Sequence, residues 1–319
     1  MKQYARASSS GTAANGPLRR LRPALGTFVE VTAQMAPGGD ARTWQRSEVL
    51  QGLITQAFSG IANLEGVFSC FTPASELYRV NHAPVGEWIE ISGELAEVLG
   101  FGARLEQASD GAFRMMAERE YELAGEGARS RRPPGATAFR RVRRTSELGF
   151  DLGGLAKGYI VDAAFARLVE ARPDVHWVVN AGGDLRSSHP FRAAVRVPTG
   201  AEEFEYDFML PACALATSSR ETSLNRKPTA RYLPRRDPSR PSYTSRAIFA
   251  DTSAASRWDP APVGPNTVCV MAENCLTADA LTKVGLFRGT GDVPGFPVFQ
   301  MAAFASNGAV IGDGRANGA

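Results

Sequence analysis

The sequence predicts a protein of mixed α and β structure, and three observations support this. The chain has 319 residues, of which 44% are hydrophobic and 22% charged, so it has enough apolar mass for one large domain or two joined lobes. Some segments carry apolar residues at helical spacing, whereas others are short, β-branched and bounded by glycine or proline. The two kinds of segment are interspersed along the chain, and no internal repeat is evident.

The N-terminal part combines a tail, a strand and two helices. We expect residues 1–20 to form a disordered tail, because the segment is rich in polar and small residues. A strand is predicted at Thr27–Ala33, where β-branched residues partly alternate. Gln45–Phe68 is predicted to be a helix, since its apolar residues recur at roughly helical spacing. A second helix is predicted at Gly93–Ser109, with Ser92 as its N-cap.

The rest of the chain alternates between strands and helices with apolar cores. A helix at Leu155–Ala171 and a buried strand at His176–Asn180 follow from their apolar patterns. The remaining predicted elements are strands at Phe191–Val197, Glu203–Leu210, Thr267–Ala272 and Val298–Ala305, and a helix at Thr277–Phe287. The basic, Pro-rich stretches 122–147 and 220–266 are predicted to be exposed connections, and residues 307–319 a flexible C-terminal tail.

The bulk properties argue against several classes of function. A net charge of +3 is too small to indicate nucleic acid or an anionic membrane as the main partner. No segment approaches the ~20 apolar residues of a membrane span, and the N-terminus lacks the apolar core of a secretory signal, so we expect a cytoplasmic protein. The four cysteines lack metal-knuckle spacing, and neither a Gly-x-Ser-x-Gly nor a His-Glu-x-x-His motif occurs. A zinc site and a serine hydrolase are therefore not expected.

The first candidate motif is Asp151-Leu-Gly-Gly-Leu-Ala-Lys157, which enters a predicted helix. Paired glycines expose backbone N–H groups there, and the helix dipole favours an anion at this end. Lys157 lies one turn into the helix and could reach a phosphate or a carboxylate. The alternative is an ordinary glycine turn that packs a helix on a sheet, with Lys157 solvated, and local chemistry alone favours this alternative.

The second candidate motif lies in the last predicted helix. Asp279, Thr282 and Lys283 are spaced i, i+3 and i+4, and hence share one face of that helix. A carboxylate and a hydroxyl on one face suit magnesium, a hard cation that takes oxygen ligands and bridges to phosphates. The alternative is an Asp in the first turn that complements the helix dipole, with Thr282 as a surface residue.

Two further motifs are weaker. The glycine-rich turn Asn180–Asp184 follows a strand, where a ligand could approach the backbone. Phe71 and Tyr78 could stack on a flat ring, with Ser75 and Glu76 nearby for hydrogen bonds. The alternatives are an ordinary tight turn for the first and, for the second, a helix start with Ser75 as N-cap, Glu76 in the first turn and the aromatics in the core.

The order and spacing of these motifs resemble those of the ApbE family of FAD:protein FMN transferases. The residues that carry the resemblance are, in chain order, Leu25 to Thr27, Ser69 to Asn81, Ser109 to Phe113, Asp151 to Tyr159 with Asp162, Asn180 to Asp184, Ala216 to Ser218, and Ala278 to Thr282. The likeness implies a compact α+β fold with antiparallel sheets and helices, and an FAD cleft between lobes. The implied domain covers residues 21–306.

The resemblance also implies a reaction and a set of site residues. A threonine hydroxyl of an acceptor flavoprotein would attack the FMN phosphorus of FAD and release AMP, with Mg²⁺ bridging the pyrophosphate oxygens. Asp279, Thr282 and the backbone carbonyl of Gly154 would hold the magnesium. The positions that match FAD-contacting residues of the family are Leu25, Phe71, Ala112, Phe113, Asp151 and Lys157.

The chain departs from the family pattern at three places. No histidine follows His189, so the family's His-x-x-Asp-Pro segment lacks its expected general base, although Asp259-Pro260 resembles the end of that segment. Arg114 and Met115 stand where Asp and Thr usually follow Gly-Ala-Phe, and Lys283 stands where a magnesium-binding threonine is common. No catalytic residue is assigned. An impaired FAD-binding protein that acts as a carrier or regulatory partner, and a scaffold with a closed site, are the alternatives to a transferase.

Overall fold

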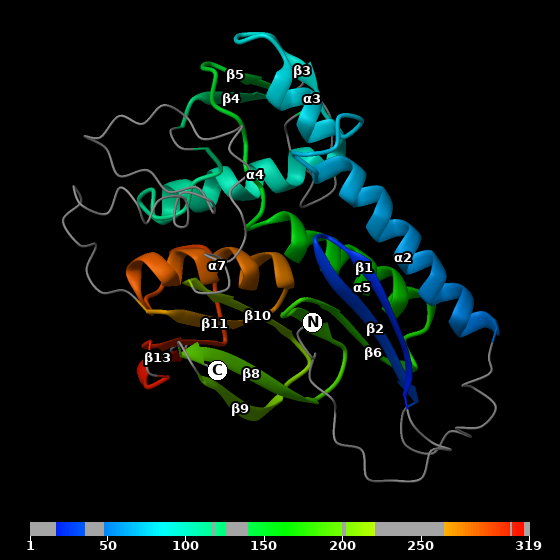
Figure 1. The fold of residues 1–319 in the computed structure, drawn as a ribbon. Helices are drawn as coiled ribbons and strands as arrows, with labels where there is room; N and C mark the ends of the chain where they lie inside the picture. The colour runs from blue at the N-terminus through cyan, green and yellow to red at the C-terminus, as the bar shows by residue number, and fades with distance from the viewer. Residues whose placement is uncertain are drawn as a thin grey trace.

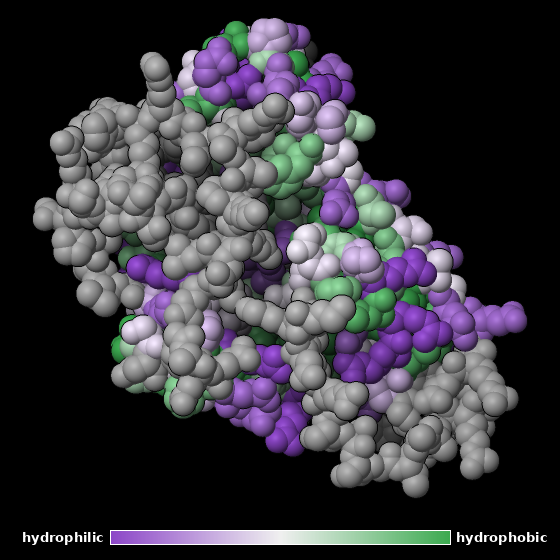
Figure 2. Space-filling model, in the orientation of Figure 1, coloured by the Kyte–Doolittle hydropathy of each residue, from purple (hydrophilic) through white to green (hydrophobic). Residues whose placement is uncertain are grey.

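The structure is a computed structural model that describes residues 17–35, 48–116, 119–125, 140–199, 202–220, 265–306 and 308–315. Among these residues, no helix is long and apolar enough to cross a membrane. Hydrophilic and hydrophobic residues are intermixed on the described part of the face drawn in Figure 2. The expected general-base region around Asp259 lies outside the described residues.

An eight-stranded antiparallel sheet forms the centre of the fold, in the order β1-β2-β6-β7-β10-β11-β12-β13. Its strands are β1 (Leu18–Ala24), β2 (Thr27–Met35), β6 (Val175–Ala181), β7 (Asp184–Ser187), β10 (Ala214–Ser219), β11 (Thr267–Ala272), β12 (Gln300–Phe304) and β13 (Val310–Arg315). Along β2, the alternate residues Val29, Val31 and Ala33 are fully buried, as the period of two in a strand requires.

Three helices cover one face of this sheet, as Figure 1 shows: α2 (Glu48–Phe68), α5 (Ala156–Ala171) and α7 (Cys275–Arg288). The helix α5 lies between α2 and α7 and packs on β6, whereas α7 packs on β10 and β11. Nearly all residues of α7 are buried, including Asp279 and Lys283. The two helices that carry the candidate motifs are therefore direct neighbours in the interior.

The opposite face of the sheet is covered by a hairpin, β8 (Phe191–Thr199) and β9 (Glu202–Leu210). A second apolar cluster joins the two layers, with Val195 and Val197 from the hairpin packed with Val178 and Leu185 of the sheet. The molecule thus has a helix layer, a sheet layer and a hairpin layer.

A smaller region lies beyond the helix layer (Figure 1). It contains α3 (Glu76–His82), α4 (Gly93–Ala108) and a three-stranded sheet in the order β3-β5-β4, with β3 (Ile89–Glu90), β4 (Tyr121–Ala124) and β5 (Arg141–Arg144). Its apolar residues, such as Leu95 and Leu99, belong to the same core cluster as the main sheet. The predicted α+β class with antiparallel sheets is confirmed.

Three expectations about the ends and connections were wrong. The strand β1 begins at Leu18, inside the expected tail 1–20, and β13 occupies Val310–Arg315, inside the expected tail 307–319. Both are edge strands. Most side chains of β1 are exposed, as are Val310 and Ile311 of β13, so the apolar alternation that reveals a strand in a sequence is weak there. The expected connection 122–147 likewise contains β5 and most of β4, which pair with each other.

Candidate functional site

The helices α5 and α7 make an unusually close contact at Gly158. An ideal Cβ on this glycine would lie 2.5 Å from the carbonyl oxygen of Cys275, so a side chain does not fit there. Four residues further along α5, the carboxylate of Asp162 accepts hydrogen bonds from the N–H groups of Cys275 (2.9 Å) and Leu276 (2.8 Å), which satisfies two free donors at the start of α7. Arg186 pairs with Asp162 from β7 at 2.7 Å. The two motif helices are thus fixed relative to each other.

The first charged pair of the site joins the glycine-turn motif to the Asn180–Asp184 motif. Lys157 Nζ forms an ion pair and hydrogen bond with Asp184 Oδ2, and Asp184 is only 1% exposed. Burial alone would lower the pKa of Lys157, but Asp184 and Asp279 outweigh burial and hold this pKa above its usual value. Lys157 is thus paired with a carboxylate of the protein itself, and its contact with FAD stays a prediction.

The second charged pair lies on α7. Lys283 Nζ donates to Asp279 Oδ1 at 2.7 Å, to Ser218 Oγ at 2.6 Å and to Thr282 Oγ1 at 3.1 Å. The Thr282 hydroxyl donates in turn to the backbone carbonyl of Asp279 at 2.6 Å. The alternative of a first-turn Asp is wrong, because α7 begins at Cys275 and Asp279 lies in its second turn, wholly buried.

Together, Lys157, Asp184, Asp279 and Lys283 form what we call the charge cluster. It contains two lysines and two aspartates, so its formal charges balance. Burial would raise the pKa of Asp279, but Lys283 and Lys157 outweigh it and bring this pKa below its usual value. Nonetheless, Asp279 Oδ2 is buried with no hydrogen-bond partner among the described residues.

The glycine turn lies directly against the charge cluster. An ideal Cβ on Gly154 would lie 3.1 Å from Lys283 Cγ and 3.4 Å from a ring carbon of Phe113. The N–H of Gly153 donates to Asp151 Oδ1 at 2.9 Å, so Asp151 shapes the turn itself. The three residues expected to hold a metal, Gly154, Asp279 and Thr282, thus surround the side chain of Lys283.

The stretch that contains Ala112 and Phe113 is tied to the glycine turn by hydrogen bonds. The N–H of Phe113 donates to Ser109 Oγ at 3.1 Å, and the carbonyl of Met115 accepts from the N–H of Asp151 at 2.7 Å. Glu106, which was not predicted from the sequence, stabilises this stretch. Its carboxylate accepts from Met115 N–H and from Tyr121 O–H, each at 2.6 Å. The signal for it was an acidic residue at a core position of α4.

Leu25 lies in a tight turn next to the Asn180–Asp184 turn. It has φ 55° and the following Gly26 has φ 68°, so the two-residue hairpin has the positive dihedrals of a type I′ turn. A leucine is strained in this conformation by about 1–2 kcal/mol. Glu65 Oε1 accepts from the Leu25 N–H at 3.2 Å. An ideal Cβ on Gly182 would lie 2.5 Å from Thr27 Oγ1, which shows how closely the two turns pack.

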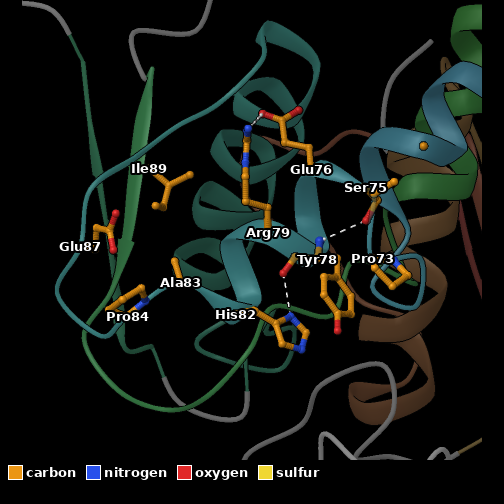
Figure 3. A pocket seen from close by; sticks show the side chains of 12 residues that line it. Pro73, Ser75, Glu76, Tyr78, Arg79, His82, Ala83, Pro84, Glu87 and Ile89 are labelled. Atoms are coloured by element: carbon orange, nitrogen blue, oxygen red, sulfur yellow. Dashed lines mark hydrogen bonds and ion pairs between the residues drawn. The ribbon is translucent and has the colours of Figure 1, made fainter.

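The aromatic motif around Phe71 forms a separate feature. The capped helix start is confirmed, because Ser75 Oγ accepts from Tyr78 N–H at 3.1 Å, and Glu76 lies in the first turn and accepts from Ser92 N–H and O–H at 2.6 Å each. The expectation that the aromatics lie in the core is wrong for Phe71, whose side chain is exposed. A cavity of about 810 Å³ lies here, and Figure 3 shows Tyr78 and His82 side by side along it, their ring centroids 3.6 Å apart. No member of the charge cluster lines this cavity. Phe71, 55% exposed, lies before α3.

Comparison with known proteins gives one family and several similar structures. The model of the ApbE family matches residues 25–240. No protein of curated function matches the sequence. The structure resembles the ApbE protein of Thermotoga maritima, with a TM-score of 0.65 and 20% identity over 95% of this chain and 97% of that one.

Two further solved structures are similar over nearly the whole chain. The flavinyl transferase ApbE of Pseudomonas stutzeri, in its apo form, has a TM-score of 0.65 and 16% identity, with 95% of each chain covered. The flavin transferase ApbE of Vibrio cholerae has a TM-score of 0.60 and 19% identity, with 95% of this chain and 98% of that one covered. At these identities the likeness establishes a shared fold.

Proposed function

Because the chain belongs to the ApbE family, we propose that it acts as a flavin transferase that takes FAD as its substrate. In the proposed reaction, a threonine hydroxyl of an acceptor protein attacks the FMN phosphorus of FAD. The new bond is a phosphoester, the bond to the AMP phosphate breaks, and the threonine proton leaves to a base that we do not assign.

The observation that carries this proposal is the meeting of distant motifs at one point. Phe113, Gly154, Ser218 and Lys283 come from four separate segments, yet the side chain of Lys283 contacts Ser218 and lies against the turn at Gly154, which also faces the ring of Phe113. A glycine turn at a helix start, beside two lysines, suits the pyrophosphate of FAD.

The proposed roles of the cofactor-binding residues follow from their chemistry. Lys157, whose side chain is 25% exposed, would offset the charge of the pyrophosphate, and Asp151 would hold the turn open for it. Leu25 and Phe71 would contact the isoalloxazine ring, one as an apolar surface and the other by stacking. Ala112 and Phe113, both buried, would line the path between ring and phosphates.

The residues expected to bind magnesium do not fit that ion in this chain. The hydroxyl of Thr282 and one oxygen of Asp279 are already bonded to the Lys283 ammonium, which leaves Asp279 Oδ2 as the only unpartnered side-chain oxygen of the pair. Magnesium requires near-octahedral oxygen ligands at about 2.0–2.1 Å. A divalent ion there would lie beside a lysine ammonium, so we leave magnesium out of the proposed reaction.

A second candidate function is FAD binding without transfer, as in a carrier or regulatory partner. Two observations favour it: no histidine follows His189, and the buried Nε of Arg114 has no hydrogen-bond partner among the described residues. Loss of a general base typically lowers a rate by about 10²–10⁴. Such a protein would bind FAD tightly and turn it over slowly or not at all.

The test is incubation of the purified full chain with FAD and an acceptor protein that carries a threonine target. Chromatography measures AMP, and in-gel fluorescence of the denatured acceptor measures covalent flavin. Transferase function predicts both products in equal amounts, and a Thr→Val acceptor should receive no flavin. FAD that binds but yields neither product selects the second function, and absence of FAD binding contradicts both.

A further inference from the structure

The ammonium of Lys283 occupies the centre of the candidate metal site. Its three N–H groups have three oxygen acceptors: Asp279 Oδ1 at 2.7 Å, Ser218 Oγ at 2.6 Å and Thr282 Oγ1 at 3.1 Å. These three bonds use the full donor capacity of a lysine. The side chain is only 10% exposed, so the ammonium is held in place and does not extend freely into solvent.

The stem of Lys283 fills the space between α7 and the glycine turn. Its Cγ and Cε lie 3.1 Å and 3.5 Å from the ideal Cβ position of Gly154. A side chain at residue 154 would therefore press against the stem of Lys283, which would have to shift by a few tenths of an ångström. The lack of a side chain at Gly154 thus leaves the space that the stem of Lys283 occupies.

The charge balance of the cluster also disfavours a divalent metal ion. Lys157 and Lys283 contribute two positive charges, and Asp184 and Asp279 contribute two negative ones. Without Lys283, the cluster would carry one uncompensated, buried negative charge at Asp279, which is the arrangement that attracts a metal ion. With Lys283 present, a divalent cation would add two unbalanced positive charges to an enclosed site.

We propose that the ammonium of Lys283 is the built-in cation of this site and takes the place of a divalent metal ion. Lys283 is a positioning residue: it neutralises Asp279, ties β10 to α7 through Ser218, and supplies positive charge beneath the glycine turn. The part of this inference that concerns FAD rests on the proposed function, whereas the exclusion of a divalent metal ion rests on the geometry of the site alone. FAD binding then needs no divalent ion.

The first measurement tests metal binding without FAD. Mn²⁺, an oxygen-seeking stand-in for magnesium, is titrated into the full-length protein and followed by electron paramagnetic resonance. The wild type should show no stoichiometric binding, whereas Lys283→Thr, which replaces the ammonium with a hydroxyl, should bind Mn²⁺ at least about tenfold more tightly. Asp279→Asn in the Lys283→Thr background should abolish that gain. Arg192→Thr, which removes an exposed positive charge on β8, is the matched control and should behave as wild type.

The second measurement tests FAD affinity by flavin fluorescence, in excess Mg²⁺ and in a chelator. The wild type should bind FAD equally, within about twofold, in both conditions, and Lys283→Thr should lose about tenfold or more in the chelator. The proposal would be overturned if the wild type bound Mn²⁺ stoichiometrically and FAD strengthened that binding. This measurement uses the wild type alone, so it does not depend on whether a variant folds. If the wild type binds no FAD, the proposed function fails, while the Mn²⁺ titration still decides whether Lys283 excludes the metal.

Discussion

The two aspartates of the charge cluster are almost wholly buried, and each is hydrogen-bonded to one lysine. A buried carboxylate that loses its partner costs more than an exposed ion pair contributes, because the charge stays out of water. Asp184, at 1% exposure, pairs with Lys157 in this way. By contrast, the pair of Arg143 and Glu122 is one-third to one-half exposed, and pairs of that kind contribute little.

Lys157→Met should therefore destabilise the protein by about 3 kcal/mol or more in urea unfolding. Arg143→Thr, the control, should cost less than about 1 kcal/mol. The double variant Lys157→Met/Asp184→Asn should be less destabilised than the sum of the two single variants, since the unpaired charge is then absent. Equal, small effects of Lys157→Met and Arg143→Thr would show that Asp184 is not dependent on its lysine.

The cysteines offer a separate residue-scale prediction about burial. Burial raises the pKa of Cys213 to about 11 and that of Cys269 to about 12, and Cys275 is likewise raised. A raised pKa lowers the thiolate fraction at neutral pH, so these thiols should be unreactive in the native state. Only Cys70, which is partly exposed, should react with a thiol reagent at pH 8, and Cys70→Ser should remove that reaction. Fast reaction of two or more thiols would contradict the described packing.

At the scale of elements, the site depends on the contact of α5 with α7. Gly158→Ala should push the two helices apart and cost about 2 kcal/mol or more, because the new Cβ meets the backbone oxygen of Cys275 at 2.5 Å. Gly52→Ala on α2 is the matched control: nothing lies within 4 Å of its Cβ position, so it should stabilise by about 0.5–1 kcal/mol. Thermal unfolding measures both, and stabilisation by Gly158→Ala would contradict the helix packing.

Elements with a buried face were predicted best. The bounds of β11 agree with the sequence prediction, and α2, α4 and α5 agree within three residues, because their apolar faces repeat at the expected period. The edge strands β1 and β13 were missed, since pairing at an edge leaves no such pattern. The strands β4 and β5, of four residues each, were missed because they are too short to show a clear apolar repeat.

At the scale of the whole molecule, the sequence motifs indicated which segments meet, but not which of their side chains pair with one another. Lys157 and Asp279 stood out from their local chemistry, yet the strand residues that complete the cluster, Asp184 and Ser218, are distant from them in the sequence. Asp184 reaches Lys157 only through the pairing of β6 with β7, and Ser218 reaches Lys283 only through the packing of α7 on β10. Sequence spacing places a lysine and an aspartate on one face of a helix, but it could not show that the ammonium fills the expected metal position.

The bounds of the folded domain are also a property of the whole molecule. Because β1 and β13 complete the two edges of the main sheet, we propose that the folded unit extends from at least Leu18 to Arg315. This proposed unit is longer at both ends than the expected domain of residues 21–306, which stays a prediction.

The central claim is that the glycine turn and the charge cluster form an FAD site, and FAD affinity tests it most directly. Fluorescence titration of the full-length wild type, Lys157→Met and Arg192→Thr separates the site from the rest of the surface. We predict one FAD per chain for the wild type and for Arg192→Thr, with at least about tenfold weaker binding for Lys157→Met at a temperature where it is folded. No binding to the wild type, or equal binding by all three proteins, would contradict the claim.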